Sequence, residues 1–221
     1  MGKKKFKIDW KSKFIDLLIV IVGISIAFKL NTWNESNKAN REIQEYILSF
    51  NEESLDNKAT LNNALEYSLS IKKDLDSLKL ILLAKEYDHP NIKDYTASLM
   101  GLSNFIPVTA TMENITASGE FGLIKDAELK KGLIDTYSSY KSTIKVDGLL
   151  LEYVDKYLIP YFFENIRFSD FSEIKGDFFK NPKFENIVFG YDVLLNQQIK
   201  SYSGALEEIN NLIITIDANK K

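Results

Sequence analysis

The stretch FIDLLIVIVGISIAFKLNTWNE, from Phe14 to Glu35, decides the fold of this chain. Its residues 17–28 carry no charge, and with the apolar neighbours the run reaches about 20 residues, roughly 30 Å of helix, which is enough to cross a bilayer. A cleaved secretory signal and a buried core helix are the alternatives, and Ser25-Ile26-Ala27 offers small residues that a signal peptidase accepts. The flanks favour a membrane span, because helix-forming sequence follows the run and six lysines precede it.

The lysines also predict the orientation of the span. They are Lys3, Lys4, Lys5, Lys7, Lys11 and Lys13. Positively charged flanks stay in the cytoplasm, whereas Lys38 and Arg41 stand among glutamates after the run. Trp33 has the place of an interfacial aromatic residue. We therefore expect a basic cytoplasmic head at 1–13, a transmembrane helix at 14–34 and an extracytoplasmic helical bundle at 35–221.

One face of the predicted span is small and polar. At about 100° per residue, a narrow sector and its edge collect Asp16, Gly23, Ala27, Asn31 and Asn34. Gly23 and Ala27 form a small-xxx-small pair, which lets a second helix approach closely. The sector therefore predicts a helix–helix contact. Two other readings stay open: Asp16 lies at headgroup depth beside Lys13 while Gly23 is incidental, or Asp16 relays protons.

Composition excludes several classes of protein. The 221 residues include 10 Gly, 4 Pro and no Cys, so a turn-rich β-sandwich is disfavoured, and disulfides, thiolate catalysis and cysteine metal sites are excluded. The net charge is −3 although the head is basic, so the remaining chain is acidic. An acidic body with only two arginines, Arg41 and Arg167, is a poor binder of nucleic acid.

No group of residues carries a recognisable chemistry. The single histidine, His89, stands in the turn Asp88-His89-Pro90-Asn91 and has neither a second metal ligand nor an orienting group in sequence. The sequence contains no phosphate-binding loop, no Ser–His pair and no metal-ligand spacing. We therefore expect no enzyme, and no catalytic, cofactor-binding or metal-binding residue.

Apolar residues at helical spacing predict an all-α fold, an antiparallel bundle of four or five helices that continues from the span. A long helix covers 35–86, either unbroken or with a break near 54–60. Further helices are expected at 92–102, 109–118, 126–158 and 186–217, with an interruption at Gly148 and an end or kink at Pro160. Gly119 is expected in the left-handed conformation and Asp126 as an N-cap, joined by a buried apolar link over 121–124.

Eight aromatic residues gather between Tyr161 and Phe184, with Gly176 and Pro182 among them. Such a cluster suits a ligand pocket, a membrane-facing surface, or an irregular cap that closes the bundle end by ring packing. We favour the cap, because most aromatic residues of folded domains are part of a core.

Two motifs resemble a known family. Gly23-Ile24, Ile26-Ala27, Asn31 and Trp33-Asn34-Glu35 resemble the signature of an uncharacterised family of single-span membrane proteins common in Bacteroidota. Asp16 stands where that family has an acid, whereas Lys29 replaces its usual glutamine. A second similarity covers Ser118-Gly119, Leu123-Ile124, Glu128-Leu129 and Tyr137. The resemblance covers the first two-thirds of the chain. It implies an inner-membrane anchor and a helical periplasmic domain, and it implies no activity.

These observations together predict a non-enzymatic interaction or scaffold protein, anchored in the inner (cytoplasmic) membrane by a single pass. Its expected partners are membrane lipid and either further copies of itself or another membrane protein of a larger envelope complex, without nucleic acid and without a cofactor. The alternative is a periplasmic ligand-binding sensor that acts through a partner. The sequence names no small-molecule ligand.

Overall fold

The computed structural model describes residues 10–174 and 176–220 and confirms the all-α fold. The elements are α1 (Trp10–Ala84), α2 (Ile92–Ala97), the 3-10 helix η1 (Ser98–Met100), α3 (Ala110–Ala117), the 3-10 helix η2 (Glu120–Leu123), α4 (Ala127–Tyr153), the π-helical turn η3 (Val154–Leu158), α5 (Ile159–Asn165), β1 (Ile166–Arg167), β2 (Ser172–Glu173) and α6 (Pro182–Asn219). The two short strands form one antiparallel pair.

The chain divides into two compact units, Met1–Tyr46 and Ile47–Lys221, and α1 contributes to both. In the first unit, the large apolar side chains from Phe14 to Trp33 are between 45% and 70% exposed. This part of α1 is long and apolar enough to cross a membrane. The predicted basic head falls mainly on residues 1–9, which lie outside the described residues.

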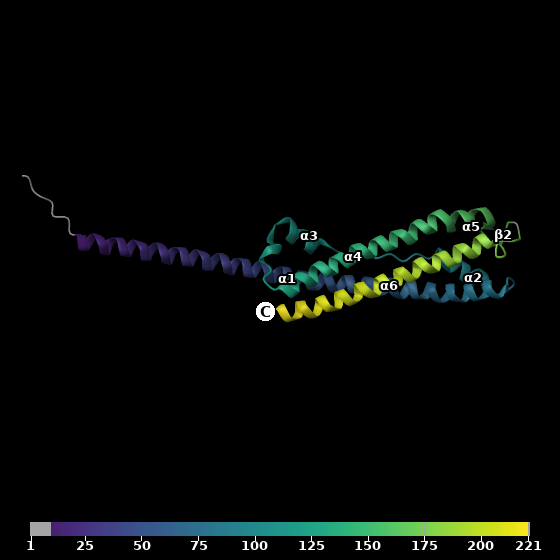
Figure 1. Ribbon diagram of the computed structural model, residues 1–221, viewed down its shortest axis with the longest axis horizontal. Helices are drawn as coiled ribbons and strands as arrows, with labels where there is room; N and C mark the ends of the chain where they lie inside the picture. The colour runs from purple at the N-terminus through teal and green to yellow at the C-terminus, as the bar shows by residue number, and fades with distance from the viewer. Residues whose placement is uncertain (1–9, 175, 221) are drawn as a thin grey trace, which may run out of the picture. The chain divides into compact units, whose positions relative to one another are not determined.

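Three long helical segments build the second unit: the part of α1 from Ile47 onward, α4 and α6 (Figure 1). The α1 segment and α6 run antiparallel. Ser68 donates a hydrogen bond to Gln198 (3.1 Å), and Lys79 donates one to Asp192 (2.5 Å). The partner in α6 therefore lies earlier in the chain as α1 proceeds, which shows that the two helices are antiparallel. Lys72 also pairs with Asp192, at 3.3 Å, so one acid of α6 bridges two turns of α1.

Helices α4 and α6 are antiparallel as well, and they approach closely near the end of α4. Thr136 donates to the carbonyl oxygen of Glu208 (3.3 Å), and Tyr153 donates to that of Ile187 (3.1 Å). A Cβ at Gly190 would collide with the hydroxyl and ring of Tyr153. Glycine at position 190 therefore leaves room for the hydroxyl end of the Tyr153 ring beside α6.

The antiparallel order of the bundle has one exception that the sequence did not indicate. Because α6 is antiparallel to both other segments, α1 and α4 run in the same direction. Residues 101–109, which we call the return segment, make this possible. They form neither helix nor strand and carry the chain back along the bundle before α3 and α4 begin (Figure 1).

Several local predictions are confirmed. Gly119 has a φ of 78°, in the left-handed region where glycine carries no steric penalty. Asp126 caps α4, since its carboxylate accepts a hydrogen bond of 2.7 Å from the amide of Leu129. The link over 121–124, between Gly119 and Asp126, was expected to be buried, and only part of it is. Ile124 is buried, but Phe121 and Leu123 remain half-exposed, because η2 turns one side of this short link to solvent.

Some predicted helix boundaries are wrong. Helix α4 is not interrupted at Gly148. Of the two alternatives for 35–86, the structure has the unbroken helix, since α1 continues through 54–60. The helical path also passes Pro160 and ends at Asn165. The π-helical turn η3 ends two residues before Pro160. Pro160 cannot donate an amide hydrogen bond, and the wider turn accommodates this gap.

Helix α6 starts at Pro182 and not at residue 186. Asn181 is its N-cap and accepts a hydrogen bond of 2.9 Å from the amide of Lys183. Proline is favoured in the first turn of a helix, where its missing amide hydrogen costs nothing. Pro182 is therefore the first residue of α6, whereas the predicted helix begins four residues after it.

Candidate functional site

The five residues predicted as a helix–helix contact face all lie on α1 within the first unit and are exposed. A Cβ added at Gly23 would meet no atom within 4 Å. Asn31 donates a hydrogen bond of 2.8 Å to the carboxylate of Glu35, one turn further on. Asp16, Gly23, Ala27, Asn31 and Asn34 are thus free, in the described part of the chain, to meet a second helix.

In the second unit, Asp147 of α4 holds the return segment in place. One carboxylate oxygen accepts hydrogen bonds from Gln198 and Tyr202 of α6, both at 2.8 Å. The other oxygen accepts a hydrogen bond of 2.8 Å from the amide of Phe105 in the return segment. Gln198 also donates to the carbonyl oxygen of Ser103 (3.0 Å). This network joins α4, α6 and the return segment.

Burial raises the pKa of Asp147, and the hydrogen bonds from Phe105, Gln198 and Tyr202 oppose that shift. Both carboxylate oxygens already accept protein donors, so the group is arranged to hold structure together. Catalysis would need a free oxygen facing a substrate. The sequence offers one signal for this residue: Asp147 follows Tyr140 by seven positions on the buried side of α4.

A buried acid, Glu53 of α1, fixes the beginning of α3. Its carboxylate accepts hydrogen bonds from the hydroxyl of Tyr137 and from the amide of Thr111, the latter at 2.9 Å. Burial and the hydrogen bond to Glu53 raise the pKa of Tyr137, so its hydroxyl stays protonated and keeps donating. One turn away, Asn57 exchanges two hydrogen bonds with the backbone of Val108, at 2.7 and 2.8 Å.

A cavity of about 580 Å³ opens between the return segment, α3 and α4; we call it the α3–α4 cavity. Its apolar and aromatic walls come from Pro107, Met112, Ala117, Tyr137, Tyr140 and Ile144. Lys141 and Glu113 supply the charges at its edge. Its volume lies within the range of about 300–1,000 Å³ that is typical of small-molecule sites.

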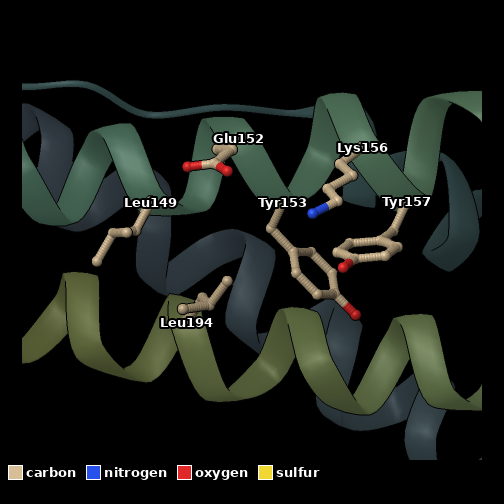
Figure 2. Close-up of a pocket in the computed structure, with 6 residues that line it drawn as sticks. All are labelled: Leu149, Glu152, Tyr153, Lys156, Tyr157 and Leu194. Atoms are coloured by element: carbon tan, nitrogen blue, oxygen red, sulfur yellow. The ribbon is translucent and has the colours of Figure 1, made fainter.

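A second cavity, of about 410 Å³, lies between the return segment and the following turns of α4. It shares Ile144 with the α3–α4 cavity, and Ile106, Gly148 and Leu151 also line it. A smaller one of about 210 Å³ lies between α4, η3 and α6 (Figure 2). There the Tyr153 ring points from α4 toward α6, which narrows the space.

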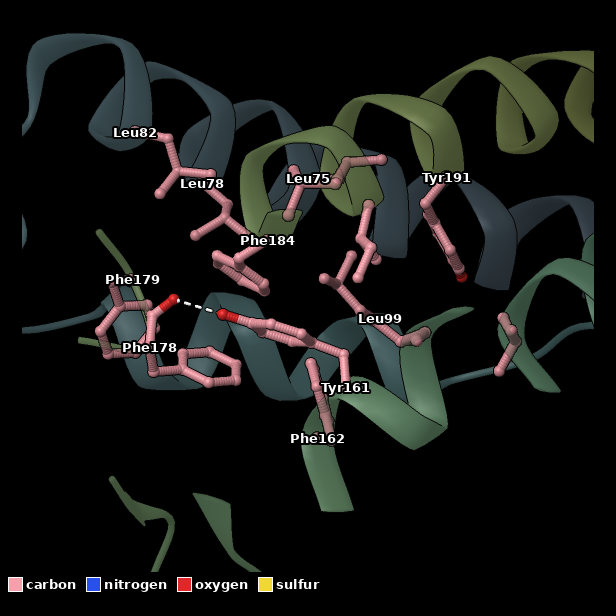
Figure 3. Close-up of a cluster of buried hydrophobic side chains, with 14 of the residues drawn as sticks. Leu75, Leu78, Leu82, Leu99, Tyr161, Phe162, Phe178, Phe179, Phe184 and Tyr191 are labelled. Atoms are coloured by element: carbon pink, nitrogen blue, oxygen red, sulfur yellow. Dashed lines mark hydrogen bonds between the residues drawn. The ribbon is translucent and has the colours of Figure 1, made fainter. Parts of the chain in front are cut away.

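The aromatic residues at the end of the bundle form a packed cap, as favoured from the sequence (Figure 3). Phe162, Phe178 and Phe184 are almost fully buried, and the rings of Phe178 and Phe184 lie 4.6 Å apart. Burial raises the pKa of Tyr161 to about 12, and its hydroxyl donates a hydrogen bond of 2.9 Å to the carbonyl oxygen of Phe178. These rings fill the bundle end by contact with one another.

His89 takes part in a turn. Its Nδ1 accepts a hydrogen bond of 3.2 Å from the amide of Asn91, and its ring stacks on Tyr95 with centroids 6.4 Å apart. Residues 10–174 and 176–220 contain no group of three or more histidine, aspartate or glutamate side chains placed to hold a metal ion.

Within the described residues, the geometry thus offers an exposed apolar helix in one unit, and in the other a buried acid, Glu53, a half-buried acid, Asp147, and a cavity with a largely apolar lining. The chain matches none of the protein-family models, curated proteins or solved structures with which it was compared.

Proposed function

We propose that this protein is a non-enzymatic interaction or scaffold subunit that a single α1 span anchors in a membrane. One observation carries the proposal: the apolar part of α1 is fully outside any protein core, while residues 47–221 possess a core of their own. An apolar helix of this length without a protein cover needs lipid around it.

The lysines before the span favour a cytoplasmic N-terminus and a helical body on the opposite side. The resemblance to single-span proteins of Bacteroidota supports the inner membrane and a periplasmic body. In this arrangement the body is available to proteins of the cell envelope.

The face formed by Asp16, Gly23, Ala27, Asn31 and Asn34 would bring the span into contact with a second helix. The small residues allow close approach of two backbones, and the asparagines supply hydrogen bonds across the contact. A second copy of the chain is the simplest partner, and a different membrane protein is the other.

A disulfide-crosslinking experiment tests this contact, since the chain contains no cysteine that would interfere. Asn34→Cys is expected to crosslink two copies in native membranes, whereas Thr32→Cys on the opposite side of the helix is not. Adding Gly23→Leu and Ala27→Leu should weaken the association by roughly 5–30-fold, the equivalent of about 1–2 kcal/mol. Ser25→Leu, also on the opposite side, is the matched control and should leave crosslinking unchanged.

Equal crosslinking at Asn34→Cys and Thr32→Cys would exclude a specific face. If Asn34→Cys forms no dimer, gentle detergent extraction and mass spectrometry of the intact complex distinguish a different protein partner from an isolated chain. An isolated chain that binds neither itself nor another protein would overturn the proposed function.

The cavities favour a second candidate function, a ligand-binding sensor. The α3–α4 cavity has the size and apolar lining of a small-molecule site. A sensor of this kind would signal through a partner protein.

A further inference from the structure

Two tyrosines of α4 are among the residues that line the α3–α4 cavity. Tyr137 and Tyr140 are 7% and 1% exposed, and their hydroxyls form hydrogen bonds with Glu53 and Asn57 respectively. Both hydroxyls are therefore already used in hydrogen bonds within the bundle, and the two tyrosines bound the cavity as buried side chains. Met112 adds a flexible, polarisable side chain to this lining, which adapts to ligands of differing shape.

Of the two charged side chains at the cavity, Glu113 has a hydrogen-bond partner, whereas Lys141 has none among the described residues. Glu113 accepts a hydrogen bond of 2.6 Å from the hydroxyl of Thr109 and lies in the first turn of α3, where the helix dipole favours a negative group. Lys141, by contrast, forms no ion pair or hydrogen bond within residues 10–174 and 176–220. An anionic group at the cavity mouth would therefore find a free ammonium group.

The cavity also continues along α4 into a neighbouring cavity, whose lining is largely apolar apart from Asn104 and Asp147. Ile144 lines both this cavity and the neighbouring one of about 410 Å³. At Gly148, a Cβ would meet no atom within 4 Å, so the wall is open at this point. Leu151 and Ile106 lie further along and are 47% and 72% exposed. A flexible hydrocarbon tail would cover these side chains.

We infer that the α3–α4 cavity binds one single-chain amphiphile with an anionic head, of the free fatty-acid class. The head lies beside Lys141, and the tail passes over the Tyr137 and Tyr140 rings toward Gly148. The volume suits a molecule of drug-like size, so a lipid with two acyl chains is too large. This inference goes beyond the proposed anchoring and interaction role and does not depend on it.

A photoreactive dodecanoate with a diazirine in its tail tests the inference on the full-length protein in membranes. Peptides of the span are expected to be labelled from the lipid in every sample, which provides an internal reference. Peptides from α3 and α4 should also be labelled, and an excess of dodecanoate should remove only this second signal.

Three variants and a neutral probe identify the cavity as the source of that signal. Ala117→Phe fills the cavity from the exposed side of α3 and should abolish labelling of α3 and α4. Lys141→Gln should lower it roughly three- to fivefold, the scale of one exposed ion pair. Lys145→Gln, one turn further along α4 and outside the cavity lining, should not change it. The corresponding diazirine alcohol should label the cavity weakly and with no dependence on Lys141.

Labelling confined to the span in the wild-type protein would overturn the inference while leaving the membrane anchor intact. Labelling of α3 and α4 that persists in Ala117→Phe, or that falls equally in Lys141→Gln and Lys145→Gln, would mean unspecific partitioning and would also overturn it. Circular dichroism of each variant verifies that the bundle remains folded.

Discussion

Replacing Phe184 with alanine is expected to lower the free energy of unfolding by about 3–5 kcal/mol, the cost typical of deleting a buried phenylalanine ring. Phe184 has no exposed surface and packs against the rings of Tyr161, Phe178 and Phe179. The Phe184 ring thus connects the beginning of α6 to α5 and to the loop that precedes α6. The rigid neighbouring rings would not collapse into the space, so a cavity would remain.

Guanidinium unfolding of the full chain in mild detergent, followed by circular dichroism, measures this loss as a shift in the midpoint. Phe163→Ala is the matched control, because Phe163 belongs to the same aromatic region but is 67% exposed. Its effect should stay within about 0.5 kcal/mol. Similar losses in both variants would contradict the assignment of the Tyr161–Phe184 region as a packed cap.

Replacing Asp147 with alanine is the second change with a large expected effect, a destabilisation of about 2–4 kcal/mol. It would remove the shared acceptor of three donors: the amide of Phe105, the Gln198 side chain and the Tyr202 hydroxyl. Each unsatisfied buried donor costs about 1–3 kcal/mol. The expected destabilisation is smaller than the summed cost of three unsatisfied donors. The reason is that Asp147 also lines the open cavity of about 410 Å³, from which water can reach part of the network.

The same unfolding experiment measures the effect of Asp147→Ala, with Glu152→Ala on the exposed side of α4 as the control. Hydrogen exchange adds a local observable, since the amide of Phe105 should lose its protection in Asp147→Ala while amides in the middle of α6 keep theirs. An unchanged Phe105 exchange rate would show that the return segment is held by other contacts.

Much of the fold could be predicted from the sequence because its signals are local. The apolar run at 14–35, the glycine at 119 and the acid at 126 each act on their own turn of the chain, and the latter two have the expected geometry. The start of α6 was missed because Pro182 was read as part of an irregular region, although proline also begins helices.

The parallel course of α1 and α4 could not be predicted in the same way. Apolar periodicity indicates which face of a helix is buried, and it contains no information on the order in which helices pack. That order depends on the return segment, which is held by contacts over long sequence distances, such as the one between Asn57 and Val108.

The two candidate sites also differ in how far they could be predicted from the sequence. The predicted contact face of the span rests on helical geometry alone, so its five residues can be named from the sequence, and their contact with a second helix stays a prediction. The α3–α4 cavity depends on how far α3 stands from α4, and no periodic pattern encodes this distance. Tyr137 and Tyr140 would have been read simply as core residues of α4, and Lys141 as a solvent-exposed charge.

Labelling of single cysteines with a membrane-impermeant maleimide tests the central claim most directly, since the native chain contains none. Lys4→Cys precedes the span, and Lys200→Cys lies on an exposed position of α6. We predict that the full-length chain stays in the membrane after carbonate washing. Lys200→Cys should be labelled once the outer membrane is permeabilised. Lys4→Cys should be labelled only after the inner membrane is permeabilised as well. A soluble chain that lacks its apolar run, or Lys200→Cys protected until the inner membrane is permeabilised, would contradict it.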